Sequence, residues 1–231
     1  MKVLLLQNNP IESFGCYLEQ IEARDIRSRL VHVYAGEALP ATAGWDAVIV
    51  GGTPESAMTL HRHSALGREV PYLRELVAAD IPIFGVCCGG QVLAMILGGS
   101  VERLPAMEIG LVELELTDEG RGSDLLAGFP RTFPAFEWHA DVFVPPPGAQ
   151  TLIGGGAWRA QAYQSGLNVG VLFHLEYGID GVERWAEAYA NELAPTGLMA
   201  RDIVEQCMPH AEKMQSLGRR LMGNYLDMLG A

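Results

Sequence analysis

Short apolar runs alternate with amphipathic segments through the first hundred residues of the chain. Four apolar runs have the length of buried strands: 2–6, 30–34, 45–50 and 81–86. Other segments repeat apolar residues every three or four positions, as one face of a helix does: 11–24, 65–79 and 90–97. Strands and helices that alternate in this way predict an α/β fold, in which helices cover both faces of a mostly parallel central sheet.

The pattern changes after residue 100, where apolar runs follow one another without long amphipathic segments between them. These runs predict strands that add an antiparallel extension to the sheet: 109–117, 133–144, 159–164 and 168–175. Helical spacing returns near the C-terminus, in the segments 181–193, 200–207 and 211–229. Because Pro195-Thr196-Gly197 is the only linker-like stretch, we predict one domain over residues 1–231, with a core of about 1–193 and a helical tail over 198–231.

Composition and charge narrow the classes of function. The chain has 231 residues and a formal net charge of −12, and its Lys and Arg residues are scattered. Since a phosphate backbone would be repelled, nucleic acid is not an expected partner. No apolar run approaches the roughly 20 residues that cross a bilayer, and the first run is too short for a signal peptide, so no membrane partner is expected. The four cysteines include no CxxC pair, which predicts reduced thiols and a cytoplasmic location.

The segment Gly85-Val86-Cys87-Cys88-Gly89 joins an apolar strand directly to an apolar helix. This strand–turn–helix layout is typical of a nucleophile elbow, with Cys87 as the nucleophile. The flanking glycines allow close backbone approach, and the N-terminus of the next helix favours the thiolate. The backbone N–H of Cys88 would then stabilise an oxyanion. Taken alone, the segment is equally compatible with a small buried cysteine in a tight turn.

A second strand-like segment, Gly170-Val171-Leu172-Phe173-His174-Leu175-Glu176, ends in a base and a carboxylate. Residues two apart on a strand point to the same face, so Glu176 could orient the imidazole of His174 toward a thiol. Sites in open α/β sheets form at the carboxyl ends of strands, where both segments end. Alone, His174 and Glu176 are better explained as an unrelated strand-end pair. The two segments together favour a Cys-His-Glu triad of Cys87, His174 and Glu176.

These segments resemble the motifs of class I glutamine amidotransferases. The elbow and the residues after it, Gly85–Gln91, resemble the G-[IV]-C-x-G-x-Q motif, and Gly170–Glu176 resembles G-x-Q-F-H-P-E. Val50–Pro54 is similar to the glycine loop of the family, Glu108–Gly110 to its E-I-G strand start, and Glu137–Asp141 to the W-x-H-x-D segment of domains like that of GMP synthase. Order and spacing agree through roughly the first 180 residues.

The resemblance implies a flavodoxin-like amidotransferase fold and a glutaminase mechanism. Cys87 would attack the γ-carboxamide of glutamine, release ammonia and hold a γ-glutamyl thioester, which water hydrolyses to glutamate. His174 would act as base and then acid, with Glu176 orienting it. Leu172 and Leu175 replace the usual Gln and Pro of the motif, but neither position supplies triad chemistry, so we expect the triad to be intact.

The resemblance also implies roles for residues around the triad. The oxyanion hole would consist of the backbone N–H groups of Gly52 and Cys88. Gln91 would hold the glutamine substrate, and the backbone around Trp138 and His139 would bind its α-amino and α-carboxylate groups. Ala140 occupies a position that is commonly Gly, and the loop at Gly52 lacks the common G-G-P order, so the contacts there are less well defined than the elbow.

Three functions are compatible with this pattern. The first is glutamine hydrolysis with ammonia passed to a separate synthase enzyme, since the 55 residues after Glu176 are too few for a synthase domain. The second is hydrolysis of γ-glutamyl peptides or amides by the same triad, and the third is a non-catalytic binding module. No cofactor is expected, and His61 and His63 lack the further ligands of a metal site. Nothing in the pattern defines an oligomeric state.

Overall fold

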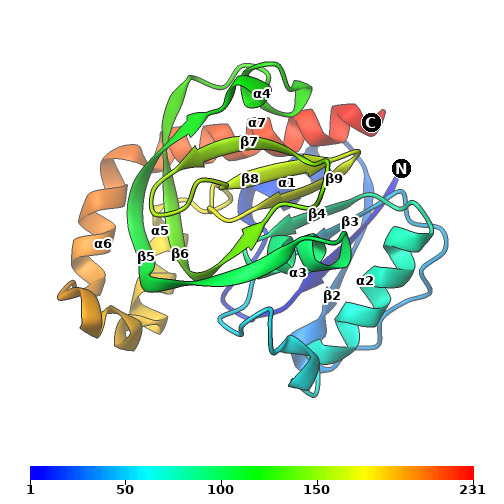
Figure 1. Cartoon of the computed structure of the whole chain (residues 1–231), viewed down its shortest axis with the longest axis horizontal. Helices are drawn as coiled ribbons and strands as arrows, with labels where there is room; N and C mark the ends of the chain where they lie inside the picture. The colour runs from blue at the N-terminus through cyan, green and yellow to red at the C-terminus, as the bar shows by residue number, and fades with distance from the viewer.

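Nine strands form a single mixed sheet in the computed structural model, which describes all residues from 1 to 231 (Figure 1). Their order across the sheet is β2-β1-β3-β4-β9-β8-β7-β5-β6. The strands are β1 Lys2–Gln7, β2 Arg27–His32, β3 Ala47–Val50, β4 Ile83–Val86, β5 Ser100–Leu116, β6 Thr132–Val144, β7 Gln150–Gly155, β8 Ala162–Ser165 and β9 Asn168–Val171. Neighbours from β2 to β9 pair in parallel, and those from β9 to β6 pair antiparallel. The predicted α/β class with an antiparallel extension is therefore confirmed.

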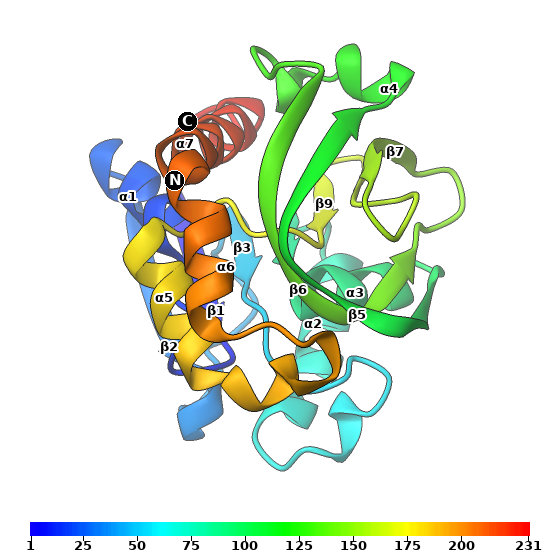
Figure 2. The same ribbon diagram turned by 90° about the vertical axis from the view of Figure 1, so that its left-hand side faces the viewer.

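Helices cover both faces of the parallel half of this sheet. The helices are α1 Gly15–Ala23, α2 Glu69–Ala78, α3 Cys88–Ile96, α4 Asp118–Arg121, α5 Ile179–Ala188, α6 Ala200–Cys207 and α7 Ala211–Met228. Helices α1, α5, α6 and α7 gather on one side (Figure 2), and their buried side chains belong to one apolar cluster. Those of α2 and most of those of α3 belong to a second cluster on the other face, and Ala94 of α3 belongs to a third, smaller cluster.

Strand β1 shows why the parallel strands are continuously apolar. Val3 and Leu5 pack into the cluster below α1 and α7, whereas Leu4 and Leu6 pack into the cluster below α2 and α3. Since successive side chains on a strand point to opposite faces, a strand that is covered on both faces must be apolar at every position.

The structure differs most from the predicted elements at three strands. Smaller differences occur at β2, which spans Arg27–His32 instead of 30–34, and at the helix predicted over 181–193, which is α5 followed by a 3₁₀ helix over Ala190–Thr196. Strand β9 ends at Val171, short of the predicted residue 175, and His174 makes only an isolated bridge to Phe136. Strand β7 was not predicted, because Gln150–Gly155 ends in two glycines and has little apolar character. Strand β5 begins at Ser100, because long-range pairing with β6 extends it through a mostly exposed stretch with a register shift between Arg103 and Glu108. Strand pairing that spans distant residues leaves a weak local signal.

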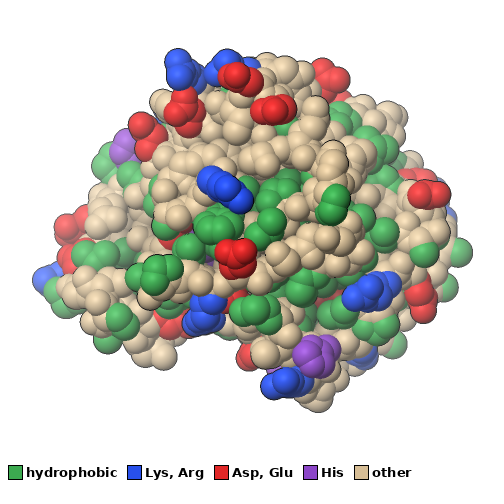
Figure 3. Space-filling model, in the orientation of Figure 1, with side chains coloured by type: hydrophobic (Ala, Val, Ile, Leu, Met, Phe, Trp, Pro, Cys, Tyr) green, Lys and Arg blue, Asp and Glu red, His purple; other side chains and the backbone are tan.

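Helix α7 packs on the rest of the molecule through the apolar side chains that its helical spacing predicts. Met214, Leu217, Leu221 and Tyr225 are buried in the same cluster as residues of α1 and of the sheet. Lys and Arg side chains lie apart rather than in one patch on the face shown in Figure 3. None of the helices combines the length and the apolar composition that crossing a bilayer requires.

Candidate active site

Cys87 lies at a sharp turn between strand β4 and helix α3. Its φ is +50°, which is uncommon for a residue with a side chain and fits a strained nucleophile elbow. A Cβ added at Gly85 would lie 2.5 Å from the backbone carbon of Gly89, and one at Gly89 would lie 2.4 Å from the backbone oxygen of Val50. The backbone N–H of Cys87 donates to the Val171 carbonyl at 2.8 Å, which ties the turn to the end of β9. The two predicted glycines are therefore required by backbone packing.

Replacing Gly89 with alanine should lower the free energy of unfolding by about 1–3 kcal/mol, because the new methyl group would meet the backbone of Val50. Urea denaturation followed by circular dichroism measures this change. Gly122→Ala is the matched control, since Gly122 has a negative φ and its nearest neighbour, the Glu119 oxygen, would lie 3.7 Å from the added carbon. Equal stability of the two variants would contradict the close packing at the elbow.

His174 and Glu176 form a buried hydrogen-bonded pair beyond the end of β9. The imidazole Nδ1 and the carboxylate Oε1 are 2.7 Å apart, and both residues are almost completely buried. The His174 backbone N–H donates to the Phe136 carbonyl at 2.8 Å, so β6 supports this segment although the strand has ended. The ring of Trp185 on α5 lies edge-on against the imidazole, with centroids 4.5 Å apart. The imidazole is thus fixed by a carboxylate on one side and by aromatic packing on another.

Two helices hold the backbone of this segment in place. The Cys16 N–H at the start of α1 donates to the Glu176 carbonyl at 2.9 Å. A Cβ at Gly15 would lie 2.0 Å from the same Glu176 oxygen, and one at Gly218 of α7 would lie 2.2 Å from the Leu175 oxygen. Both helices therefore approach the segment as closely as glycine permits, and helix α7 acts as a support for the site.

The second nitrogen of His174, Nε2, is buried and receives no hydrogen-bond partner in the structure. Burial opposes a charge on the ring, but the carboxylate of Glu176 and the neighbouring sulfur of Cys87 outweigh it and raise the pKa of His174 well above its usual value. The electrostatics therefore favour an imidazolium beside the sulfur of Cys87. This arrangement can supply both a nucleophile and a proton donor.

A cavity of about 270 Å³ opens in front of the sulfur. Four of the residues predicted from sequence line it: Cys87, Gln91, Trp138 and His139. It is large enough for an amino acid, and polar and aromatic residues line it together with Cys87, as in small-molecule sites.

Gly52 and Cys88 lie next to Cys87. A Cβ at Gly52 would lie 3.3 Å from the Cys87 Cβ, and the Gly52 N–H makes no backbone hydrogen bond. Cys88 is the first residue of α3, so its N–H has no acceptor within the helix. Gly52 and Cys88 therefore each have an unpaired backbone N–H close to Cys87.

Gln91 contacts the backbone of β6. Its Nε2 donates to the carbonyl of Asp141 at 2.7 Å, and its own N–H donates to the Cys87 carbonyl at 3.0 Å. The Asp141 carboxylate in turn pairs with Arg103 at 2.9 Å and accepts from the Ser56 hydroxyl. Sequence reasoning missed Arg103 and Ser56, because they come from distant segments and match no motif.

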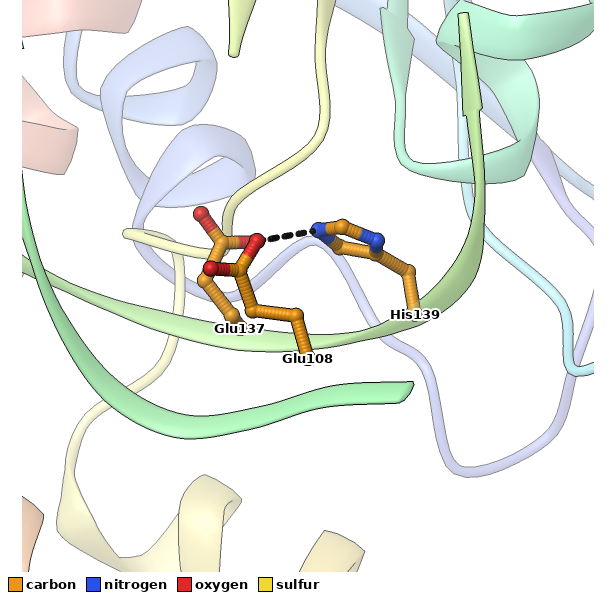
Figure 4. Close-up of side chains that lie close together, drawn as sticks. All are labelled: Glu108, Glu137 and His139. Atoms are coloured by element: carbon orange, nitrogen blue, oxygen red, sulfur yellow. Dashed lines mark ion pairs between the residues drawn. The ribbon is translucent and has the colours of Figure 1, made fainter. Parts of the chain in front are cut away.

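His139 belongs to a buried ionic cluster behind the cavity (Figure 4). Its Nε2 lies 3.1 Å from Glu137 Oε2 and 3.4 Å from Glu108 Oε2. Burial opposes the charge, but the two carboxylates raise the pKa of His139 to about 10. Each residue offers one ligand atom, all within 4.8 Å of one another, and carboxylates with imidazole can hold a divalent metal. An imidazolium already supplies positive charge to the two buried carboxylates, so the cluster is explained as a structural ion network.

Another part of the cavity is lined by residues that the motifs did not indicate. They are Glu12, Trp185, Tyr189 and Glu192. Trp185, Tyr189 and Glu192 reach the cavity because helix α5 and the 3₁₀ helix Ala190–Thr196 fold against β6, which no local pattern specifies. Glu12 reaches it from the loop between β1 and α1.

Comparisons with known proteins identify similar chains. Residues 11–178 match the family model described as glutamine amidotransferase class-I. The glutamine amidotransferase-like protein YfeJ of Salmonella typhimurium is 31% identical over 205 residues, which cover 84% of this chain and 83% of YfeJ. One subunit of the glutamine-hydrolyzing GMP synthase of Saccharolobus solfataricus is 34% identical over 152 residues, which cover 64% of this chain and 76% of that protein.

A solved structure agrees with these sequence matches. The crystal structure of a glutamine amidotransferase from Thermotoga maritima superimposes with a TM-score of 0.88 at 26% identity, and the match covers 100% of this chain and 99% of that one. The stretch matched by the family model contains the elbow and the His174–Glu176 pair, whereas α6 and α7 lie beyond it.

Proposed function

Because the chain belongs to the class I glutamine amidotransferase family, we propose that it hydrolyses the γ-amide of glutamine through a γ-glutamyl thioester on Cys87. The observation that carries this proposal is the buried His174–Glu176 pair beside the elbow cysteine, with the second imidazole nitrogen unpartnered. A buried imidazole that is oriented by a carboxylate and faces a sulfur is the arrangement that activates a thiol.

The first half-reaction forms the thioester. The Cys87 thiolate attacks the γ-carbonyl carbon, and the N–H groups of Gly52 and Cys88 stabilise the resulting oxyanion. The carbon–nitrogen bond breaks as His174 gives its proton to the leaving nitrogen, so ammonia departs and the γ-glutamyl group remains on sulfur. Glu176 holds the imidazole in position and stabilises its charge during both proton transfers.

The second half-reaction regenerates the enzyme. Neutral His174 takes a proton from water, and the hydroxide oxygen attacks the thioester carbon. The carbon–sulfur bond breaks, glutamate leaves, and the imidazolium is restored beside the thiolate of Cys87. Gln91 contributes by fixing the backbone of Asp141 at the cavity, and the backbone of Trp138 and His139 would meet the amino acid end of the substrate.

We propose that the ammonia passes to a separate acceptor enzyme. The similar Saccharolobus protein is by name one subunit of a glutamine-hydrolyzing GMP synthase, which supports this division of labour. The γ-amide of a γ-glutamyl compound would present the same carbonyl to Cys87, so hydrolysis of such compounds is the second candidate.

The test is to supply glutamine to the purified chain and to measure glutamate and ammonia separately. We expect both products in equal amounts, and covalent labelling of Cys87 by an electrophilic glutamine analogue. Activity on γ-glutamyl amides without any on glutamine would replace the glutaminase proposal by the second candidate. Failure of the electrophile to label Cys87 would support a non-catalytic binding module instead.

A further inference from the structure

An aromatic wall extends from the triad into the cavity. The ring centroid of Trp185 lies 4.5 Å from that of His174, Tyr189 lies 5.8 Å from Trp185, and Trp138 lies 6.2 Å from Tyr189. Trp138, Trp185 and Tyr189 all line the cavity. Aromatic rings that surround a cavity in this way attract cations through their quadrupoles.

Two carboxylates complete this wall. Glu192 Oε2 accepts a hydrogen bond from the indole N–H of Trp138 at 2.8 Å, and Glu12 Oε1 accepts one from the Tyr189 hydroxyl at 3.1 Å. The other oxygen of Glu12, Oε2, lies beside Gly52, where an added Cβ would be 2.6 Å from it, and accepts no hydrogen bond from the chain. Glu12 is only 3% exposed and lines the cavity. Because this carboxyl group lines the cavity and has one oxygen that accepts no bond from the chain, it can accept a hydrogen bond from a ligand.

Burial raises the pKa of Glu12 to about 7, and the positive His174 and the Tyr189 hydroxyl limit the rise. The carboxyl group is therefore close to its ionisation point near neutral pH. A cation that enters the cavity would favour its ionised form and gain a desolvated ion pair.

The rest of the cavity lining differs in charge from the aromatic wall. Arg103 is the only Lys or Arg that lines the cavity, and it pairs with Asp141. The wall near His174 holds no Lys or Arg to neutralise Glu12 and Glu192. Four carboxylates line the cavity: Glu12, Glu55, Asp141 and Glu192. Arg103 pairs with Asp141, and His139 pairs with Glu108 and Glu137, so neither cation is paired with Glu12 or Glu192.

Trp185 connects the proposed proton donor to this wall, since it packs against His174 and also lines the cavity. In the proposed mechanism His174 donates its proton to the departing nitrogen, and the His174 ring packs against Trp185. A substituent on that nitrogen would extend along Trp185 toward Tyr189 and the two carboxylates.

We propose that Glu12, Glu192, Trp138 and Tyr189 form a binding site for a cationic leaving amine, so that the enzyme also hydrolyses γ-glutamyl amides of diamines. The inference rests on the proposed function, because it uses the same thioester chemistry. Cys87 attacks the γ-carbonyl, the carbon–nitrogen bond breaks, and the diamine leaves with the proton from His174. Water then cleaves the thioester to glutamate, as it does for glutamine.

The experiment compares three γ-glutamyl amides of matched length, made from 1,4-diaminobutane, butylamine and 4-aminobutyrate, with glutamine as reference. We expect kcat/KM for the cationic amide to exceed that for the neutral amide by about tenfold, and the anionic amide to be the poorest substrate. Glu192→Gln and Glu12→Gln should each reduce the cationic-to-neutral ratio severalfold. Glu183→Gln, an equal charge change on an exposed position of α5, should leave the ratio unchanged.

The outcomes separate the inference from the proposed function. Equal kcat/KM for the cationic and neutral amides overturns the cation site while hydrolysis stands. An equal loss on all three amides in Glu192→Gln also overturns it, because the carboxylate would then bind the α-ammonium group that all of them share. Absence of hydrolysis of every amide and of glutamine would reject the proposed function itself.

Discussion

Replacing Cys87 with alanine should abolish glutamine turnover, with a fall in kcat of about 10⁴-fold or more, because no other group can form the thioester. Cys88→Ala should retain much of the activity. The Cys88 side chain packs in the apolar cluster on the α2–α3 face. In the proposed mechanism only its backbone N–H contacts the oxyanion, and alanine preserves that group. Steady-state release of glutamate measures both effects.

The pair of variants is informative because the two cysteines are adjacent and both buried. Labelling with an electrophilic glutamine analogue followed by peptide mass analysis should place the label on Cys87 in the parent chain and in Cys88→Ala, and nowhere in Cys87→Ala. Equal loss of activity in the two variants, with both still folded by circular dichroism, would show that the nucleophile is assigned wrongly.

His174→Ala should lower kcat/KM by about 10²–10⁴-fold, because it removes the group that donates and accepts the proton. Glu176→Gln should be less damaging, since the amide oxygen can still accept from Nδ1–H at the position that now lies 2.7 Å from it. The loss of the negative charge at residue 176 should also change the pH dependence of kcat/KM. Although burial opposes charge on His174, the Glu176 carboxylate raises the pKa of the ring, so Glu176→Gln lowers it.

A reaction that needs the imidazolium is lost as pH rises through the pKa of His174. The alkaline limb of the kcat/KM profile should therefore move to lower pH in Glu176→Gln. Glu187→Gln, on the exposed face of α5, is the matched control and should keep the parent profile. If Glu176→Gln lost as much activity as His174→Ala without a shift of the profile, Glu176 would be acting through structure alone.

Much of the fold follows from local pattern. The strand predicted over 2–6 and the helix predicted over 200–207 agree with β1 and α6. A strand that is buried on both faces needs an apolar residue at every position, and a helix needs one at every third or fourth, so both leave a regular signal. Strand β7 left no such signal, because its glycines contribute no apolar side chain and its partner strands lie elsewhere in the chain.

The sequence by itself determined the strand–turn–helix geometry at Cys87, since the strand, the turn and the helix that follows are contiguous. It also indicated His174 and Glu176, although by an argument about strand geometry that the structure replaces: β9 ends at Val171, and helices α1 and α7 hold the pair through Gly15 and Gly218. Local periodicity shows which face of a single helix or strand is buried. It could not show that α1 and α7 hold the His174–Glu176 pair, because these helices are distant from it in the chain.

Only the tertiary structure decided what surrounds the triad. Glu12 and Glu192 stand 180 residues apart in the chain and meet because the loop after β1 and the helices after β9 close over the same sheet edge. Their electrostatic effect depends on burial and on neighbours such as Tyr189, neither of which a sequence motif encodes. Reactive groups can be recognised within one segment, whereas the shape and charge of a cavity are properties of several segments packed together.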